Sequence, residues 1–207
     1  MSTVNLIIEA FLMGLTRFLT GAVVQYRGFQ FEPAAQSIFY ANHTSHLDTL
    51  LIWASIPQRY RRSVRPVAAK DYWWVSPSRR YFAEKIFRAV PVPRQRDAKS
   101  ADPLHEVDGA LAGGDSLIFF PEGTRGDGVN VQPFKSGLHH LMTKHPAVTL
   151  VPVYINNLNR VLPKGELIPV PVLCTVTFGA GIYFDSHETR ADFAVRARAA
   201  LEALAVE

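Results

Sequence analysis

The segment from Asn42 to Asp48 reads Asn-His-Thr-Ser-His-Leu-Asp. A histidine can accept a proton from an alcohol, and a carboxylate bonded to its other ring nitrogen fixes the tautomer and stabilises the imidazolium. We expect the five-residue spacing of His43 and Asp48 to bring the two side chains together where a loop meets a helix. The segment therefore predicts a general base. Taken alone, it is equally compatible with a capped helix start or, through His46, with a metal site.

A second segment, Pro121–Arg125, combines a turn-forming glycine with an arginine and a carboxylate. The forked guanidinium of Arg125 and the open backbone amides around Gly123 would suit a phosphate group. Glu122 could orient that arginine or bind a substrate hydroxyl. A surface turn with a local ion pair is the simpler alternative. Further cations that could reach a phosphate are Lys70, Arg94 and Arg96.

Both segments follow directly on apolar runs that predict strands, Ser37–Ala41 and Ser116–Phe120. Strands and helices alternate along most of the chain, which predicts an α/β fold with a mixed, largely parallel sheet flanked by helices. Ligands bind at the carboxyl ends of the strands in such sheets, so we expect the two segments to share one site. Further strands are expected at 66–69, 89–92, 149–155 and 173–178, and helices at 48–55, 78–87, 103–112, 137–144 and 189–206.

The first 27 residues form an apolar segment that we separate from the domain expected at 28–207. Glu9 and Arg17 interrupt it, and its longest uncharged run has nine residues. A single membrane span needs about 20 apolar residues, so we expect a short amphipathic helix instead. This helix could associate with a membrane interface or pack on the core of the protein.

The net charge of +4 is unevenly distributed. The stretch from Arg59 to Lys99 contains twelve Lys or Arg and three Asp or Glu, whereas the remaining chain is acidic. Such a block suggests a phosphate ligand, an anionic membrane or a nucleic acid. No groove-reading motif accompanies it, so we do not expect nucleic acid as a partner. The single cysteine, Cys174, excludes an internal disulfide, and its apolar surroundings predict a buried side chain.

Metal and cofactor chemistry has little support in the sequence. His139 and His140 are adjacent in an expected helix, so their side chains should point about 100° apart. No Gly-x-Ser-x-Gly elbow, Walker motif or dinucleotide fingerprint occurs. We therefore expect neither a bound metal nor a redox cofactor.

Together the two segments resemble the signatures of the glycerolipid acyltransferases, and in particular of their lysophosphatidate (1-acyl-sn-glycerol-3-phosphate) acyltransferase branch. Asn42–Asp48 matches the N-H-x-x-x-x-D signature, and Phe120–Arg125 matches F-P-E-G-T-R residue for residue. Ala89–Arg96 and Val151–Val153 resemble the second and fourth blocks of that family. The four blocks occur in the family's order.

The resemblance implies an O-acyltransferase that moves a fatty acyl group from acyl-CoA or acyl carrier protein, as co-substrate, to a lysophospholipid hydroxyl. Lysophosphatidate would then become phosphatidate. His43 would be the general base and Asp48 its support. The phosphate-binding residues implied are Glu122, Gly123, Thr124, Arg125, Arg94, Arg96 and Lys70, and the lining residues are Asn42, Pro121 and Pro152.

Members of this family often carry N-terminal membrane-binding helices. Membrane lipids are therefore expected partners, and the cytoplasmic face of a membrane is the expected location, with peripheral or monotopic attachment. Two other functions are compatible with the residues: a non-catalytic lipid- or membrane-binding protein of the same fold, and a metallohydrolase that uses His and Asp side chains.

Overall fold

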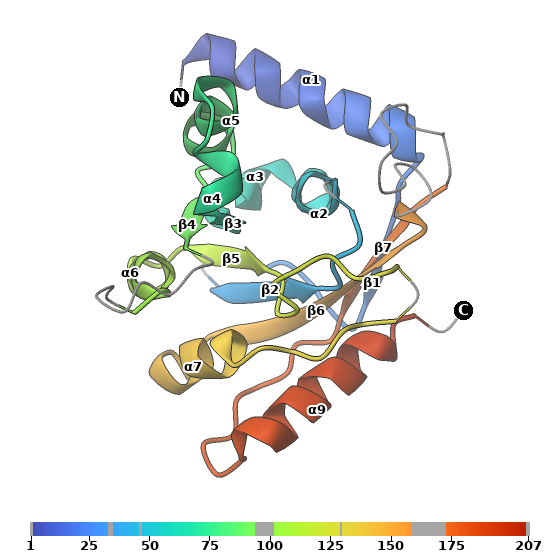
Figure 1. Ribbon diagram of the computed structural model, residues 1–207. Coiled ribbons are helices and arrows are strands. Elements are labelled where there is room, and N and C mark those ends of the chain that lie inside the picture. The colour runs from blue at the N-terminus through green and yellow to red at the C-terminus, as the bar shows by residue number, and fades with distance from the viewer. Residues whose placement is uncertain are drawn as a thin grey trace.

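The computed structural model describes residues 2–32, 35–45, 47–93, 102–128, 130–158 and 173–205. These residues form a seven-stranded sheet with helices on both faces (Figure 1). The strands are β1 Val23–Arg27, β2 Ser37–Ala41, β3 Val64–Ala69, β4 Val90–Val92, β5 Ser116–Phe119, β6 Thr149–Asn156 and β7 Thr175–Gly179. The helices are α1 Thr3–Thr20, α2 Asp48–Ser55, α3 Gln58–Arg61, α4 Lys70–Trp73, α5 Pro77–Tyr81, the π-helix η1 Phe82–Ile86, α6 His105–Ala112, α7 Gly137–Lys144 and α9 Arg190–Glu202.

The order of strands in the sheet is β1-β7-β6-β2-β5-β3-β4. Every neighbouring pair is parallel except β6 and β7. The predicted mixed, largely parallel sheet is therefore confirmed. Strand β2 lies between β5 and β6 and is buried along its whole length, as expected for an uninterrupted apolar run in the centre of such a sheet.

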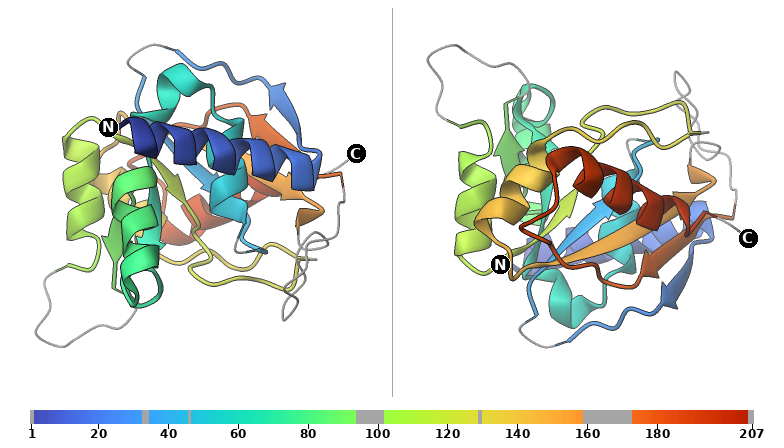
Figure 2. Two further views of the ribbon diagram at one scale, coloured as in Figure 1. Left: turned by 90° about the horizontal axis from the view of Figure 1, so that it is seen from above. Right: turned by 90° about the horizontal axis from the view of Figure 1, so that it is seen from below.

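Two hydrophobic layers enclose the sheet. Alternate residues of a strand point to opposite faces, so Phe39 and Ile118 pack toward α2, whereas Ile38 and Leu117 pack toward α6, α7 and α9. Figure 2 shows α1 crossing the first face and α7 with α9 covering the second. Both faces of the central strands are thus closed to water.

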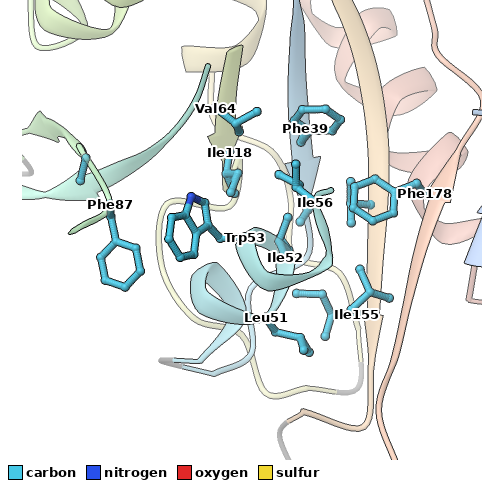
Figure 3. Packing of buried hydrophobic residues seen from close by; sticks show 14 of the residues in the cluster. Phe39, Leu51, Ile52, Trp53, Ile56, Val64, Phe87, Ile118, Ile155 and Phe178 are labelled. Atoms are coloured by element: carbon cyan, nitrogen blue, oxygen red, sulfur yellow. The ribbon is translucent and has the colours of Figure 1, made fainter. Parts of the chain in front are cut away.

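Helix α2 is anchored by its apolar side chains. Ile52 and Trp53 are 0% and 3% exposed and pack against strand residues such as Phe39 and Ile118 (Figure 3). Burying side chains of this size stabilises the packing by about 1.5–3 kcal/mol each. This anchoring fixes the first residue of α2, Asp48, beside the carboxyl end of β2.

The N-terminal segment 1–27 contains a helix and a strand, and not the single helix that the sequence predicts. Helix α1 ends at Thr20 because Gly21 adopts a left-handed conformation, with φ 50°, and donates its N–H to the carbonyl of Arg17. The following residues Val23–Arg27, at the end of the segment 1–27, form β1 and pair in parallel with β7. The β-branched and aromatic residues of this stretch favour a strand.

Two other expected helices differ in extent. The helix expected at 78–87 begins at Pro77 and changes after Tyr81 into the π-helix η1. The helix expected from 103 begins at His105, because the Asp102 carboxylate accepts the N–H of Leu104 at 3.0 Å in a preceding turn. Helix α9 follows the side-chain cap of Thr189 and ends at Glu202.

Candidate active site

The site begins where β2 ends. Asn42, the first residue beyond the strand, is buried and bonds both backbone groups of Ile155 on β6. Its side-chain N–H donates to the Ile155 carbonyl at 2.9 Å, and the Ile155 N–H donates to its side-chain oxygen at 2.8 Å. Asn42 therefore continues the sheet's hydrogen bonding by one residue and fixes the start of the loop that carries His43.

His43 and Asp48 form the predicted pair. The Nδ1 atom of His43 lies 2.8 Å from Oδ2 of Asp48, whose side chain is fully buried. The same oxygen accepts the backbone N–H groups of Thr44 at 2.6 Å and Ser45 at 2.9 Å. Because a carboxylate accepts hydrogen bonds, this contact places the proton of a neutral His43 on Nδ1 and leaves Nε2 able to accept one.

An aromatic contact also holds the ring of His43. It stacks on Phe120 with ring centroids 4.3 Å apart and an interplanar angle of 25°. The side chain is 20% exposed and lines a cleft. The imidazole therefore has a fixed orientation and access to a ligand at the same time.

Glu122 clamps the backbone of His43 from the second segment. Its Oε1 accepts the N–H of His43 at 2.7 Å, and its Oε2 accepts the N–H of Gln132 at 2.9 Å. The carbonyl of His43 in turn accepts the N–H of Gly126 at 2.8 Å. Both backbone groups of His43 are thus bound to the loop that follows β5, which fixes the two segments relative to each other.

The hydrogen-bond partners of Glu122 differ from those considered in the sequence analysis. The side chain is 3% exposed and both of its oxygens accept backbone N–H groups, so it contacts neither Arg125 nor the cleft. Burial raises the pKa of Glu122, and the N–H groups of Gln132 and His43 partly counter that rise. The geometry therefore supports a positioning role behind His43 rather than direct phosphate binding.

Glu122→Gln tests the clamp. The amide would replace one acceptor oxygen by an NH2 group that faces a backbone N–H. We expect the free energy of unfolding to fall by about 1–3 kcal/mol, as measured by urea denaturation. The matched variant Glu106→Gln changes an exposed glutamate of α6 and should stay within about 0.5 kcal/mol of the wild type. Equal stability of the two variants would contradict the clamp.

A cleft of about 910 Å³ opens beside His43 at the carboxyl ends of β3, β4 and β5. This is where parallel sheets bind their ligands. Much of its wall is apolar. The apolar side chains that line it include Val67, Ala68, Val92, Pro93, Leu104, Phe119 and Phe120. The size and lining of the cleft suit a long apolar group that reaches the imidazole of His43.

The predicted phosphate-binding and lining residues are only partly brought together. Pro121, Gly123 and Thr124 line the cleft. Arg125 and Lys70 are exposed and are not among its lining residues. Asn42 and Pro152 are buried and do not line it either. The predicted Arg94 and Arg96 lie outside the described residues, as does His46, the residue that made a metal site an alternative.

Sequence reasoning missed Lys135, which lines the cleft together with His43. Lys135 belongs to no recognised signature. It is the only Lys or Arg between Gly126 and Thr143. That isolation just before α7 is the one signal that could have drawn attention to it.

Three other potentially reactive side chains are buried or held by a carboxylate. Burial raises the pKa of the Cys174 thiol to about 11, so it is a poor nucleophile at neutral pH. His140 lies 2.9 Å from Asp102, and His145 lies 2.6 Å from Asp108. Within the described residues, no group of three or more His, Cys, Asp or Glu side chains could hold a metal ion.

The sequence pattern of the Acyltransferase family matches residues 23–156, well over half of the chain. This match includes both segments of the site. The chain belongs to the acyltransferase family. The resemblance seen in its two signatures is thereby confirmed, and the family's domain begins with β1 and continues to the end of β6.

Named relatives point to the same branch of the acyltransferases. The chain is 28% identical over 164 residues to mouse 1-acyl-sn-glycerol-3-phosphate acyltransferase alpha, covering 78% of this chain and 55% of that protein. It is 26% identical over 174 residues to the 1-acyl-sn-glycerol-3-phosphate acyltransferase of Cocos nucifera, covering 83% and 53%. The chain therefore spans about half the length of the curated relatives it matches.

A solved acyltransferase shares the fold. The crystal structure of the 1-acyl-sn-glycerophosphate (LPA) acyltransferase PlsC from Thermotoga maritima superimposes with a TM-score of 0.73 at 20% identity. The match covers 98% of this chain and 82% of that one. The mixed sheet with flanking helices is thus the fold of a known acyltransferase.

Proposed function

We propose that this protein transfers a fatty acyl group from an acyl thioester, acyl-CoA or acyl carrier protein, to the hydroxyl of lysophosphatidate, giving phosphatidate. The observation that carries the proposal is the His43–Asp48 pair at the mouth of an apolar cleft. Membership of the acyltransferase family and the names of the relatives support the same reaction.

In the proposed mechanism, Nε2 of His43 removes the proton of the acceptor hydroxyl as its oxygen attacks the thioester carbonyl carbon. The new C–O bond forms, the C–S bond breaks, and the thiolate leaves with the proton from the imidazolium. Asp48 stabilises that imidazolium through Nδ1. A thioester is already activated, so this route uses no cofactor and no covalent enzyme intermediate.

The proposal is tested with purified protein in detergent micelles. The readout is release of free thiol from a long-chain acyl thioester, with mass-spectrometric identification of the lipid product. Acyl-CoA and acyl carrier protein donors are compared in parallel. We expect thiol release that depends on added lysophosphatidate and yields phosphatidate. Lysophosphatidate binding without turnover from either donor would refute the proposal and favour a non-catalytic lipid-binding protein.

We also propose that α1 docks the enzyme on a membrane, where its lipid substrates reside. The helix faces the protein with apolar side chains that pack on the core, Ile8, Leu12 and Met13, and with polar ones. Glu9 pairs with the buried Arg61 at 3.1 Å, and Thr16 and Thr20 are buried. Its outer side carries an apolar stripe at helical spacing. The members of the stripe, which are 40–81% exposed, are Val4, Ile7, Phe11, Leu15 and Phe18.

Two further features support peripheral docking. By length and hydropathy alone, α1 is the one described helix that could cross a bilayer. Its inner side, however, is bound to the domain by core packing and by the polar contacts of Glu9 and Arg17. The hydroxyl of Tyr81 donates to Asn5 at 2.6 Å and holds α5, with Arg79 and Arg80, beside the start of α1. Basic side chains beside an apolar stripe favour an anionic surface such as the cytoplasmic leaflet.

Phe18→Ser should weaken binding to vesicles that contain anionic phospholipid by about tenfold, because it removes roughly 1.5 kcal/mol of apolar burial. Cosedimentation with the vesicles measures the partition. The matched variant Val195→Ser removes a similarly exposed apolar side chain from α9, on the opposite face of the sheet, and should bind as the wild type does. Equal losses in both variants would count against docking through α1.

A further inference from the structure

Among the described residues that line the cleft beside His43, basic side chains outnumber carboxylates. Lys135 and Arg190 line it, whereas Asp102 is the one carboxylate among its described lining residues. Asp102 is already engaged by other side chains, since its Oδ2 lies 2.9 Å from Nε2 of His140 and 3.3 Å from Nζ of Lys144. An apolar cleft with uncompensated cations favours a ligand that combines a hydrocarbon chain with an anionic group.

Lys135 lies over the glycine turn of the second segment. A Cβ atom placed on Gly123 would meet Nζ of Lys135 at 2.8 Å and its Cδ and Cε at 3.0 and 3.1 Å. The backbone N–H of Lys135 donates to the Pro121 carbonyl at 2.9 Å, which fixes the base of the side chain. Only a glycine lets the lysine pass this close, and Gly123 also has φ 70°, a conformation that other residues avoid.

Among the described residues, the ammonium group in this position has no counterion. Lys135 forms no ion pair and no side-chain hydrogen bond with any described residue. By contrast, Lys144 at the end of α7 contacts the carboxylates of Asp102 and Asp108. The nearest carboxylate of the second segment, Glu122, has both oxygens bound to backbone N–H groups. The charge of Lys135 therefore remains available to a ligand in the cleft.

We propose that Lys135 is a phosphate-binding residue, with its ammonium in contact with a phosphate of the substrate bound beside His43. This inference rests on the proposed acyl transfer. The phosphate could belong to the acceptor lipid or to the phosphopantetheine arm of the donor. Both present phosphate-ester oxygens to the same ammonium, and both must bring their reacting group to His43.

Four substrates separate the two sources. On the acceptor side, lysophosphatidate is compared with monoacylglycerol, which lacks the phosphate. On the donor side, acyl-CoA is compared with an S-acyl-N-acetylcysteamine, which also lacks phosphate. Lys135→Met should raise KM for the phosphate-bearing member of one pair by about ten- to a hundredfold, with a smaller change in kcat. The phosphate-free member of that pair should be unaffected, and Lys135→Arg should restore much of the loss. The pair in which only the phosphate-bearing substrate shows a raised KM identifies the molecule whose phosphate contacts Lys135.

The exposed Lys85 of η1 provides a matched control, because Lys85→Met removes a charge remote from the cleft and should leave all four KM values unchanged. Unchanged KM values in Lys135→Met, or equal increases for all four substrates, would overturn the proposal. Calorimetric titration with glycerol 3-phosphate and with coenzyme A gives a readout without turnover. If the wild type binds one of them and Lys135→Met binds it equally well, the proposal fails even where no acyl transfer occurs.

Discussion

His43→Ala is expected to lower kcat for acyl transfer by about 10²–10⁴-fold, the range typical for removal of a general base. The structure gives a reason to expect this loss without unfolding. The clamps on residue 43 involve its backbone N–H and carbonyl, which alanine keeps. Asp48 also retains the N–H groups of Thr44 and Ser45. The measurement is thiol release at saturating lysophosphatidate and acyl donor.

His187→Ala provides the matched control, because His187 is an exposed histidine in the turn before α9 and does not line the cleft. It should keep wild-type activity. Urea denaturation of both variants shows whether the fold is retained. Wild-type rates in a folded His43→Ala protein would exclude His43 as the base, whereas loss of activity with loss of structure would require His43→Gln as a second test.

The central part of the fold was predictable because its signals are local. Ser37–Ala41 and Ser116–Phe119 are parts of short apolar runs that end at a polar residue or a proline, and a buried parallel strand needs little more. The sequence does not separate the strand Val23–Arg27 clearly from the N-terminal helix, because no charged residue interrupts the run from Phe18 to Tyr26. Its pairing with β7 depends on residues more than 140 positions away, which no local pattern records.

The site was predictable to the same degree. The His43–Asp48 contact was expected from the five-residue spacing, because a short loop joins His43 to Asp48 at the first position of α2. The task of Glu122 did not follow, since its partners are backbone N–H groups whose direction depends on two loops meeting. Lys135 was missed for a related reason: it approaches Gly123 across the loop, and the sequence offers no spacing rule for such a contact.

The hydrogen bonds of Asp48 make its amide variant informative. All three donors, from His43, Thr44 and Ser45, converge on Oδ2, while Oδ1 is buried and has no partner among the described residues. In Asp48→Asn, the amide oxygen can occupy the Oδ2 position and accept all three bonds. The Nδ1–H tautomer of His43 is then retained, and catalysis loses mainly the negative charge that would stabilise the imidazolium. The amide NH2 takes the place of the buried, unpartnered Oδ1, so some loss of stability is also expected.

We therefore expect a graded series. Asp48→Asn should lower kcat by about ten- to a hundredfold, the value of one charge-assisted hydrogen bond, with little change in KM. Asp48→Ala should approach the loss seen in His43→Ala, because His43 is then free to change tautomer. It should also lose stability, since the N–H groups of Thr44 and Ser45 become unpaired at about 1–3 kcal/mol each. Rate measurements and urea denaturation on both variants show whether Asp48→Asn loses less activity and stability than Asp48→Ala. An Asn variant as inactive as the Ala variant would show that the charge of Asp48, and not its hydrogen-bond geometry, carries its contribution.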